Sequence, residues 1–283
     1  MIRGGRGRDN LRMATPKMIE DEALGRLRDG LHRIKLRDGR SALAKVRHGA
    51  PAGFFDAEAR GLAALREAHA LRVPDVFAVQ THGILIEDLG SGRAQHRDWE
   101  LAGTKLARMH RHASKSFGFD ADGWCGDSPQ DNTCSGDGVS FFVEQRLRAQ
   151  ARHARANGLL DESDTRHLDR ICERLADLVP DAPPVLVHGD LWIANLHACA
   201  DGELALIDAG AVHHGWAETD LAMLTLFGEP PAHFFAAYEA EAGVNSDWRQ
   251  RAPIYNLYHL INHLNLFGGG YLGSVRAVLR RYG

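Results

Sequence analysis

The most informative segment of the chain reads Val185-Leu186-Val187-His188-Gly189-Asp190-Leu191-Trp192-Ile193-Ala194-Asn195. An apolar run, residues 184–187, comes directly before His188, and a second apolar run, residues 204–207, comes directly before Asp208. Runs this short and apolar are typical of strands. An Asp-Gly pair at residues 201–202 predicts a turn between them. We therefore expect a hairpin that brings Asp190, Asn195 and Asp208 to one end.

These three polar residues carry the groups that phosphoryl transfer requires. Asp190 can act as the base near an attacking hydroxyl, because this reaction depends mainly on positioning and charge neutralisation. Asn195 and Asp208 can hold Mg²⁺, which prefers hard oxygen ligands. Each residue alone is better explained as a turn cap. Their order and spacing match the protein-kinase pattern and favour a kinase active site.

The composition indicates an ordinary globular chain. Its 283 residues are 44% hydrophobic and 25% charged, and the formal net charge is -3, so nothing predicts attraction to nucleic acid or to a membrane. The four cysteines form no CxxC pair or compact disulfide pattern. The N-terminus has no apolar secretion signal. We expect a cytoplasmic enzyme with a flexible tail over residues 1–17; the oligomeric state is not predicted.

The first half of the chain predicts a small sheet lobe over residues 18–88. Strand-like runs at 31–36 and 41–46 flank a turn and carry Lys45. An amphipathic helix is expected over 54–71 and carries Glu58. In kinases a strand Lys contacts nucleotide phosphates and a helix Glu orients it, so Lys45 and Glu58 are predicted to pair. Two solvated surface charges are the alternative.

Two further segments of this lobe are expected to meet the nucleotide. Strands are predicted at 77–79 and 83–86, and the backbone around Glu87 and Leu89 is expected to contact adenine at a glycine-rich hinge. The phosphate loop, residues 24–30, has only two glycines. Backbone amides near Gly30, with Arg26 or Arg28, could hold a phosphate, and a plain turn fits equally well.

The second lobe, residues 89–283, is predicted to be mainly helical. Helical spacing recurs at 99–112, 141–158 and 254–264. Residues 117–138 are rich in Gly, Asp and Ser and are expected to form a long ordered loop. His259 and His263 lie four residues apart on one helix face, but no third metal ligand is evident.

Several segments together resemble the fructosamine-3-kinase, or ketosamine-3-kinase, family, a relative of the aminoglycoside phosphotransferases. The resemblance runs from about Leu36 to Tyr271. The sequence departs from the family pattern in the glycine-poor phosphate loop and at Ala209-Gly210, where relatives often have Pro-Ala. The segments that carry the resemblance are residues 117–120, 126–133 and 142–147, Trp192 directly after Asp190-Leu191, and residues 214–223 and 257–271.

The resemblance implies an α+β, bilobal protein-kinase-like fold and ATP-dependent phosphorylation of the 3-hydroxyl of a ketoamine, free or on a protein. In this family the 3-phosphate destabilises the adduct, which then releases the amine. By position, Asp190 is the base, Asn195 and Asp208 hold Mg²⁺, and Lys45 and Glu58 serve the phosphates of ATP.

Three residues keep two interpretations each. Trp192 is expected to contact the substrate, with core packing as the alternative. His263 is a candidate edge of the substrate pocket, although its helix mainly packs the lobe. Asp220 either braces the catalytic loop through buried hydrogen bonds or caps a helix.

Two other functions stay open at this point. One is another small-molecule kinase, acting on an aminoglycoside, choline or homoserine. The other is a nucleotide-binding protein without catalysis. The intact set of base and metal ligands argues against the second.

Overall fold

The computed structural model describes residues 13–14 and 24–283. The predicted tail, residues 1–17, lies outside the described residues except for 13–14. The chain divides into two compact units. Unit 1 comprises residues 1–56 and 74–89, and unit 2 comprises residues 57–73 and 90–283. Among the residues that are described, no helix has both the length and the apolar character of a membrane span.

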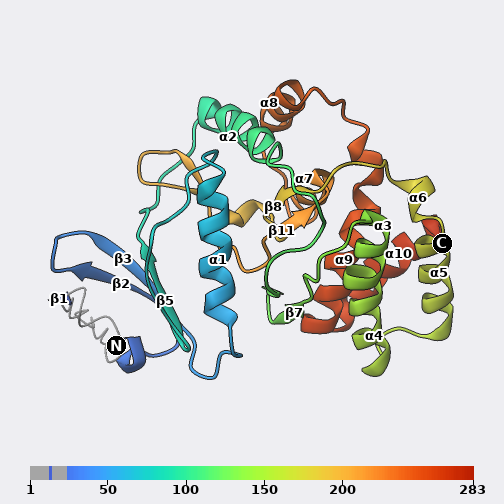
Figure 1. Cartoon of the computed structure of the whole chain (residues 1–283), viewed down its shortest axis with the longest axis horizontal. Coiled ribbons are helices and arrows are strands. Elements are labelled where there is room, and N and C mark those ends of the chain that lie inside the picture. The colour runs from blue at the N-terminus through green and yellow to red at the C-terminus, as the bar shows by residue number, and fades with distance from the viewer. Residues whose placement is uncertain (1–12, 15–23) are drawn as a thin grey trace, which may run out of the picture. The chain divides into compact units, whose positions relative to one another are not determined.

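Unit 1 contains a five-stranded sheet in the order β1-β2-β3-β5-β4 (Figure 1). β1 pairs in parallel with β2, and the other pairs are antiparallel. A short 3-10 helix, η2 (Leu24–Arg26), precedes β2. The predicted strands are confirmed, with ends shifted by one residue at most. Their bounds are β1 (Met13–Ala14), β2 (Gly30–Leu36), β3 (Ser41–Val46), β4 (Val76–Gln80) and β5 (Gly83–Glu87).

The alternation of residues in β3 sets which side chains reach the core of unit 1. Ala42, Ala44 and Val46 are buried and pack with Leu36 and Leu85. Successive strand residues point to opposite faces, so Lys45 lies on the face opposite to this core. Its backbone pairs between β2 and β5 in the middle of the sheet.

The helix α1 (Phe54–Glu67) ends four residues before the predicted bound at 71. The chain turns out of the helix at His69, which has a left-handed φ of 50°. Leu71 nevertheless stays buried, because the segment after the helix still packs inward. The apolar spacing in the sequence therefore extends beyond the end of the helix, which is why the predicted helix is too long.

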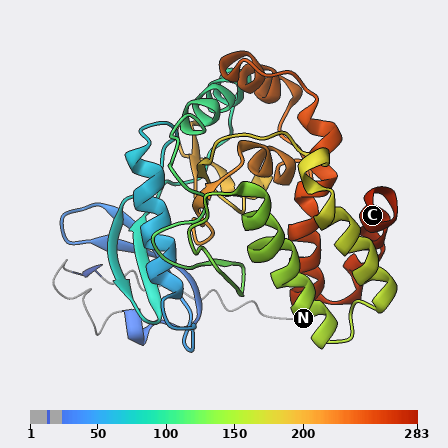
Figure 2. The same ribbon diagram turned by 45° about the vertical axis from the view of Figure 1, so that its right-hand side comes forward.

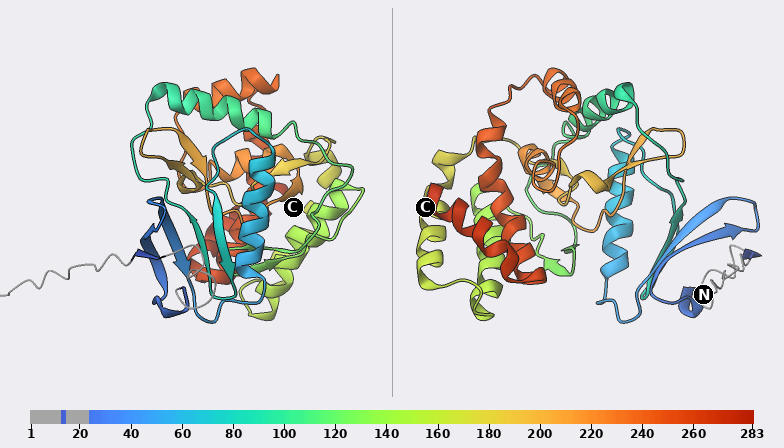
Figure 3. Two further views of the ribbon diagram at one scale, coloured as in Figure 1. Left: turned by 60° about the vertical axis from the view of Figure 1, so that its left-hand side comes forward. Right: turned by 180° about the vertical axis from the view of Figure 1, so that it is seen from behind.

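Unit 2 is mainly helical, as predicted. Its longest helix, α9, is buried along most of its length and contacts α7 and α10 (Figure 2). α2 and α8 lie side by side (Figure 3). The helices are α2 (His96–Met109), α3 (Gly138–Phe141), α4 (Ala149–Ala156), α5 (Glu162–Glu173), α6 (Leu175–Leu178), α7 (Ala217–Met223), α8 (Ala232–Ala242), α9 (Trp248–Phe267) and α10 (Leu272–Tyr282), with the short η4 (Ile193–Asn195) and η5 (Gly269–Tyr271).

The predicted helix over 141–158 contains a π-helical segment, η3 (Phe142–Arg148). Arg146 in this segment is almost completely buried. Its guanidinium donates to the side chain of Asn132 at 2.8 Å and to the carbonyl of Asp131 at 2.7 Å, and it stacks over Phe141. These contacts anchor the segment 117–138 to the helix.

Three short strand pairs correct two sequence predictions. The predicted long loop at 117–138 contains a hairpin of β6 (Gly123–Cys125) and β7 (Ser128–Gln130). The turn at 201–202 joins β9 (Leu196–Ala198) to β10 (Leu204–Leu206). β8 (Val185–Val187) pairs instead with β11 (His213–Gly215), so the predicted pairing of 184–187 with 204–207 is wrong. The turn instead pairs β10 with the strand directly before it, β9. β9 is only three residues long and is not an apolar run, so the sequence analysis did not identify it.

Candidate active site

The loop after β8 makes a sharp turn that only glycine fits. Gly189 has a φ of 80°, in the left-handed region that glycine favours. A Cβ at this position would lie 2.2 Å from the carbonyl oxygen of Ala211. The turn lies between the end of β8 at Val187 and Asp190, the residue that the sequence analysis predicts as the catalytic base.

A buried carboxylate from α7 holds this loop in place. Asp220 accepts the backbone N–H groups of His188 at 2.7 Å and Gly189 at 2.9 Å. The Nε2 of His110 lies 3.3 Å from the same carboxylate. Burial raises the pKa of Asp220, but the interactions with His110 and His188, including their hydrogen bonds, outweigh burial and leave the pKa below its usual value. Asp220 therefore braces the catalytic loop. The N-cap of α7 is Trp216, so the capping alternative is wrong.

The environment of Asp190 favours proton uptake near neutral pH. Burial raises the pKa of its carboxyl to about 6. The negative charges of Asp208 and Asp220 also raise this pKa, whereas His188 lowers it. Its side chain still keeps 23% exposure. A base is most effective when its pKa lies near the working pH, so this carboxylate suits proton transfer from a hydroxyl.

Backbone and side-chain bonds tie the catalytic loop to the segment that carries Asp208. The amide of Asn195 donates to the carbonyl of Asp190 at 2.8 Å. The N–H of Ile207 donates to the carbonyl of Asn195 at 3.2 Å, and the ring of His188 donates to the carbonyl of Ile207 at 2.8 Å. These hydrogen bonds join the loop of Asp190 and Asn195 to Ile207, the residue directly before Asp208. The hairpin predicted to bring them together was wrong in its strand pairing.

Asp208 has an unusual backbone for a residue with a side chain. Its φ is 59°, and the residue is exposed. Such strained positions persist where the surrounding structure fixes them and are frequent at functional sites. Its exposed carboxylate, and the carboxamide oxygen that Asn195 carries, are the kinds of donor that suit Mg²⁺.

α1 approaches the segment after Asp208 very closely. A Cβ at Gly61 would lie 1.9 Å from the carbonyl oxygen of Ala209. The backbone N–H of Trp124 in β6 donates to the carbonyl of Gly210 at 2.8 Å. The Ala209-Gly210 step that departs from the family pattern is thus fixed between a helix and a strand of unit 2.

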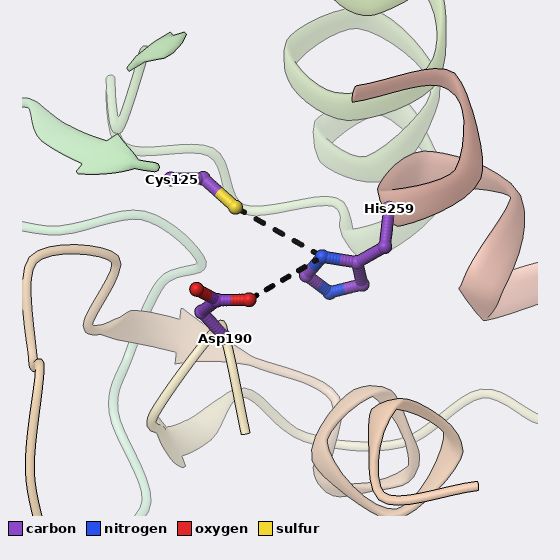
Figure 4. Close-up of side chains that lie close together, drawn as sticks. All are labelled: Cys125, Asp190 and His259. Carbon is purple, nitrogen blue, oxygen red and sulfur yellow. Dashed lines mark hydrogen bonds and ion pairs between the residues drawn. The ribbon is translucent and has the colours of Figure 1, made fainter. Parts of the chain in front are cut away.

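Two residues lie near Asp190 that the sequence analysis did not place there, Cys125 and His259, the latter considered only as a metal ligand together with His263 (Figure 4). The Nδ1 of His259 lies 3.9 Å from the Oδ1 of Asp190 and 3.9 Å from the Sγ of Cys125. Burial lowers the pKa of His259 to about 3, so its ring is neutral, and burial raises the pKa of the Cys125 thiol. These residues are 69 and 65 positions from Asp190, and no local motif links them to it.

The two candidate substrate residues have different surroundings. Trp192 is 37% exposed, so the core-packing alternative does not describe it. His263 is half-buried, and its Nδ1 donates to the carbonyl of His259 at 2.8 Å. The His263 ring lies 4.7 Å from that of Phe227 and 5.2 Å from that of Tyr271. The two histidines considered as a pair of metal ligands therefore do not share a site, because His259 faces Asp190 and His263 faces other aromatic rings.

The residues predicted to hold the nucleotide lie in both units. Gly30, Lys45, Glu87 and Leu89 belong to unit 1, whereas Glu58 belongs to unit 2 and is buried in α1. The phosphate loop is tied down at Asp29, whose carboxylate accepts the N–H of His48 at 2.7 Å. Gly30 has a φ of 127°, which other residues rarely adopt. The Lys45–Glu58 pair stays a prediction.

Comparisons with known proteins agree with these observations. The sequence model of the fructosamine kinase family matches residues 28–282. A protein named probable ketoamine kinase from Synechocystis is 36% identical, over 81% of this chain and 78% of the relative. The chloroplastic protein-ribulosamine 3-kinase of Arabidopsis thaliana is 33% identical, over 87% of this chain and 77% of the relative.

Solved structures give the same result. A structure from Thermobifida fusca assigned as a fructosamine-3-kinase is 34% identical, with a TM-score of 0.82 over 89% of this chain and 92% of that chain. An ADP-bound aminoglycoside phosphotransferase is 13% identical with a TM-score of 0.55 over 89% of this chain and 92% of that chain, which shows a shared fold. The chain belongs to the fructosamine kinase family and is a phosphotransferase with the kinase-like fold.

Proposed function

We propose that this enzyme transfers the γ-phosphoryl group of ATP to the 3-hydroxyl of a ketoamine, the rearranged adduct of a sugar and an amine. The names of the relatives support this substrate class. The observation that carries the proposal is the set of hydrogen bonds that joins the loop of Asp190 and Asn195 to Ile207, directly before Asp208. The enzyme would act in deglycation, because a 3-phosphorylated adduct breaks down and releases its amine.

The proposed chemistry is a direct in-line transfer. Asp190 accepts the proton of the 3-hydroxyl as the bond from that oxygen to phosphorus forms and the bond to the ADP leaving group breaks. No covalent phospho-enzyme is needed. The buried Asp220 keeps the loop of Asp190 fixed, which matters because this reaction depends on positioning.

Asn195 and Asp208 would hold Mg²⁺. The oxygen donors of these side chains fit its preference, and the bound ion would supply charge neutralisation at the phosphates. In unit 1, Lys45 would contact the phosphates, the backbone amides at Gly30 would cover them, and the backbone near Glu87 and Leu89 would meet adenine. Glu58 would orient Lys45. Trp192 and His263 would contact the ketoamine.

We also propose a cytoplasmic location. All four cysteines lie in the described part of the chain, and none of them forms a disulfide, which fits a reducing compartment.

The test is incubation with ATP and a panel of ribulose-, erythrulose- and fructose-derived ketoamines, followed by mass detection of an added phosphate. Aminoglycosides and choline in the same panel separate the alternative of another small-molecule kinase. Phosphate transfer to those compounds, with none to any ketoamine, would contradict the proposal.

The base is tested with Asp190→Ala. We expect turnover to fall by at least about 100-fold, the usual scale for losing a catalytic base, while ATP binding is retained. Asp208→Ala should weaken Mg·ATP binding as well, measured by calorimetry. Asp177→Ala, at an exposed carboxylate in α6, is the matched control and should match the parent in both assays. Comparable turnover by the Asp190 variant and the parent would remove the proposed base.

A further inference from the structure

The cluster of Cys125, His259 and Asp190 contains three kinds of metal-binding atom. One atom from each residue, a thiol sulfur, an imidazole nitrogen and a carboxylate oxygen, lies within 4.8 Å of the other two (Figure 4). The three residues come from β6, α9 and the catalytic loop, so tertiary packing alone brings them together. We propose that this cluster is a binding site for a soft divalent cation such as Zn²⁺, and that the bound cation inhibits the kinase by occupying Asp190.

The spacing is close to that of a tetrahedral zinc site. Zinc bonds of about 2.3 Å to sulfur and about 2.1 Å to nitrogen or oxygen place neighbouring ligand atoms about 3.4–3.6 Å apart. The Nδ1 of His259 lies 3.9 Å from both the sulfur of Cys125 and the Oδ1 of Asp190. These two pairs therefore have to close by a few tenths of an ångström. The sulfur of Cys125 and the carboxylate of Asp190, which lie within 4.8 Å of each other, have to close by at most about 1.2 Å, and side-chain rotation can supply both movements. Water or a substrate oxygen would complete the coordination.

The protein also holds the ligands in suitable orientations. The side-chain N–H of Asn262 lies 3.3 Å from the sulfur of Cys125 and donates to the carbonyl of Cys125 at 3.1 Å. The hydroxyl of Ser128 donates to the Oδ1 of Asn262 at 2.5 Å, which fixes the direction of the amide. A donor aimed at the sulfur stabilises the thiolate that a metal requires, because partners of this kind tune the ligand. The His259 ring is neutral, as a ligand must be.

The donor set separates this site from the proposed magnesium site. Sulfur and imidazole ligands favour Zn²⁺ over Mg²⁺, whereas Asn195 and Asp208 offer only oxygen. Asp190 is the most exposed of the three ligands, so the cation would enter from its side. Once bound to the cation, the Asp190 carboxylate cannot accept a proton from the substrate hydroxyl. Inhibition rests on the proposed function, but binding does not.

Binding is tested with Co²⁺ added to the full chain in the absence of nucleotide and ketoamine. We expect a thiolate-to-cobalt charge-transfer band that saturates at one equivalent. Cys125→Ser should abolish the band. Cys134→Ser is the matched control, because Cys134 is the exposed cysteine of the chain, and this variant should keep the band. A band that persists in Cys125→Ser, or that disappears in Cys134→Ser, would overturn the site.

Inhibition is tested with Zn²⁺ titrated into the ketoamine assay at saturating Mg·ATP, each variant being compared with its own activity in metal-free buffer. Cys125→Ser should raise the Zn²⁺ concentration for half inhibition by at least about tenfold, since even an outer partner of a metal site is worth about 10–100-fold. Relief of inhibition by excess Mg²⁺ would instead place Zn²⁺ on the magnesium ligands and overturn the inference. If no ketoamine is phosphorylated but the cobalt band follows Cys125, the proposed function fails and the metal site stands.

Discussion

The bond network of Asp220 allows a direct test of how the catalytic loop is held. Its two carboxylate oxygens accept the N–H groups of His188 and Gly189 at 2.7 and 2.9 Å. Asp220→Asn keeps the shape of the side chain but replaces one acceptor oxygen with an NH₂ group. One backbone N–H then faces a donor, and the negative charge that strengthened both hydrogen bonds is lost.

The expected magnitude follows from these two contacts. A hydrogen bond to a charged group contributes about 1.5–3 kcal/mol, and a buried donor without an acceptor costs about 1–3 kcal/mol, so we expect the free energy of unfolding to fall by about 3 kcal/mol. Asp190 directly follows Gly189. A displacement of about 1 Å at a reacting group can cost about 100-fold in rate, and we expect kcat to fall on that scale.

The assay is urea unfolding followed by tryptophan fluorescence, together with kcat for a ketoamine. The five tryptophans all lie in residues 90–283, so the signal reports the unfolding of unit 2. Asp137→Asn is the matched control. Asp137 caps α3 by accepting the N–H of Ser140, and asparagine caps helices as well as aspartate does, so this variant should change stability by less than about 0.5 kcal/mol. An Asp220→Asn protein with the urea midpoint and kcat of the parent would refute the bracing role.

Three further outcomes are expected. Burial raises the pKa of Asp164, but hydrogen bonds from Arg276 outweigh burial and leave the pKa below its usual value. The pair therefore stabilises the fold above about pH 4, and this stability is lost as the pH falls through the folded-state pKa. Arg276→Ala should lower the melting temperature at pH 7, and the difference in melting temperature between variant and parent should become smaller at pH 3. Gly61→Ala should cost about 1–3 kcal/mol by overpacking and lower kcat, whereas Gly273→Ala, where an added Cβ meets nothing within 4 Å, should not destabilise in urea unfolding. Trp192→Ala should raise KM for the ketoamine with an unchanged melting temperature, and an unchanged KM would remove it from the substrate pocket.

The elements predicted well from the sequence are those with local causes. β2 and β3 alternate around an Asp-Gly turn, and α9 shows sustained apolar spacing, so short-range pattern suffices for both. The order and spacing of Asp190, Asn195 and Asp208 predicted a kinase. This spacing is visible in the sequence because one loop and one short strand pair set it. The family comparisons confirm the kinase assignment that this spacing predicted.

What the sequence could not predict depends on contacts between distant segments. The pairing of β8 with β11 joins three-residue strands that have no turn between them, so no local signal specifies it. The approach of Cys125 and His259 to Asp190 results from packing of β6 and α9 against the catalytic loop. The π-helical segment around Arg146 follows from burying a guanidinium in the second unit, which residue periodicity does not reveal.

The left-handed backbone of Asp208 restricts how this active site can evolve. Among residues with side chains, asparagine, aspartate and histidine adopt such a turn most readily, as His69 also shows, and glycine tolerates it freely. The proposed metal contact independently demands a negative oxygen donor. Aspartate alone meets both demands, since glutamate strains the turn, and glycine, asparagine and histidine offer no negatively charged oxygen. Replacement of this aspartate by glutamate in the course of evolution would first require a different backbone conformation at the turn.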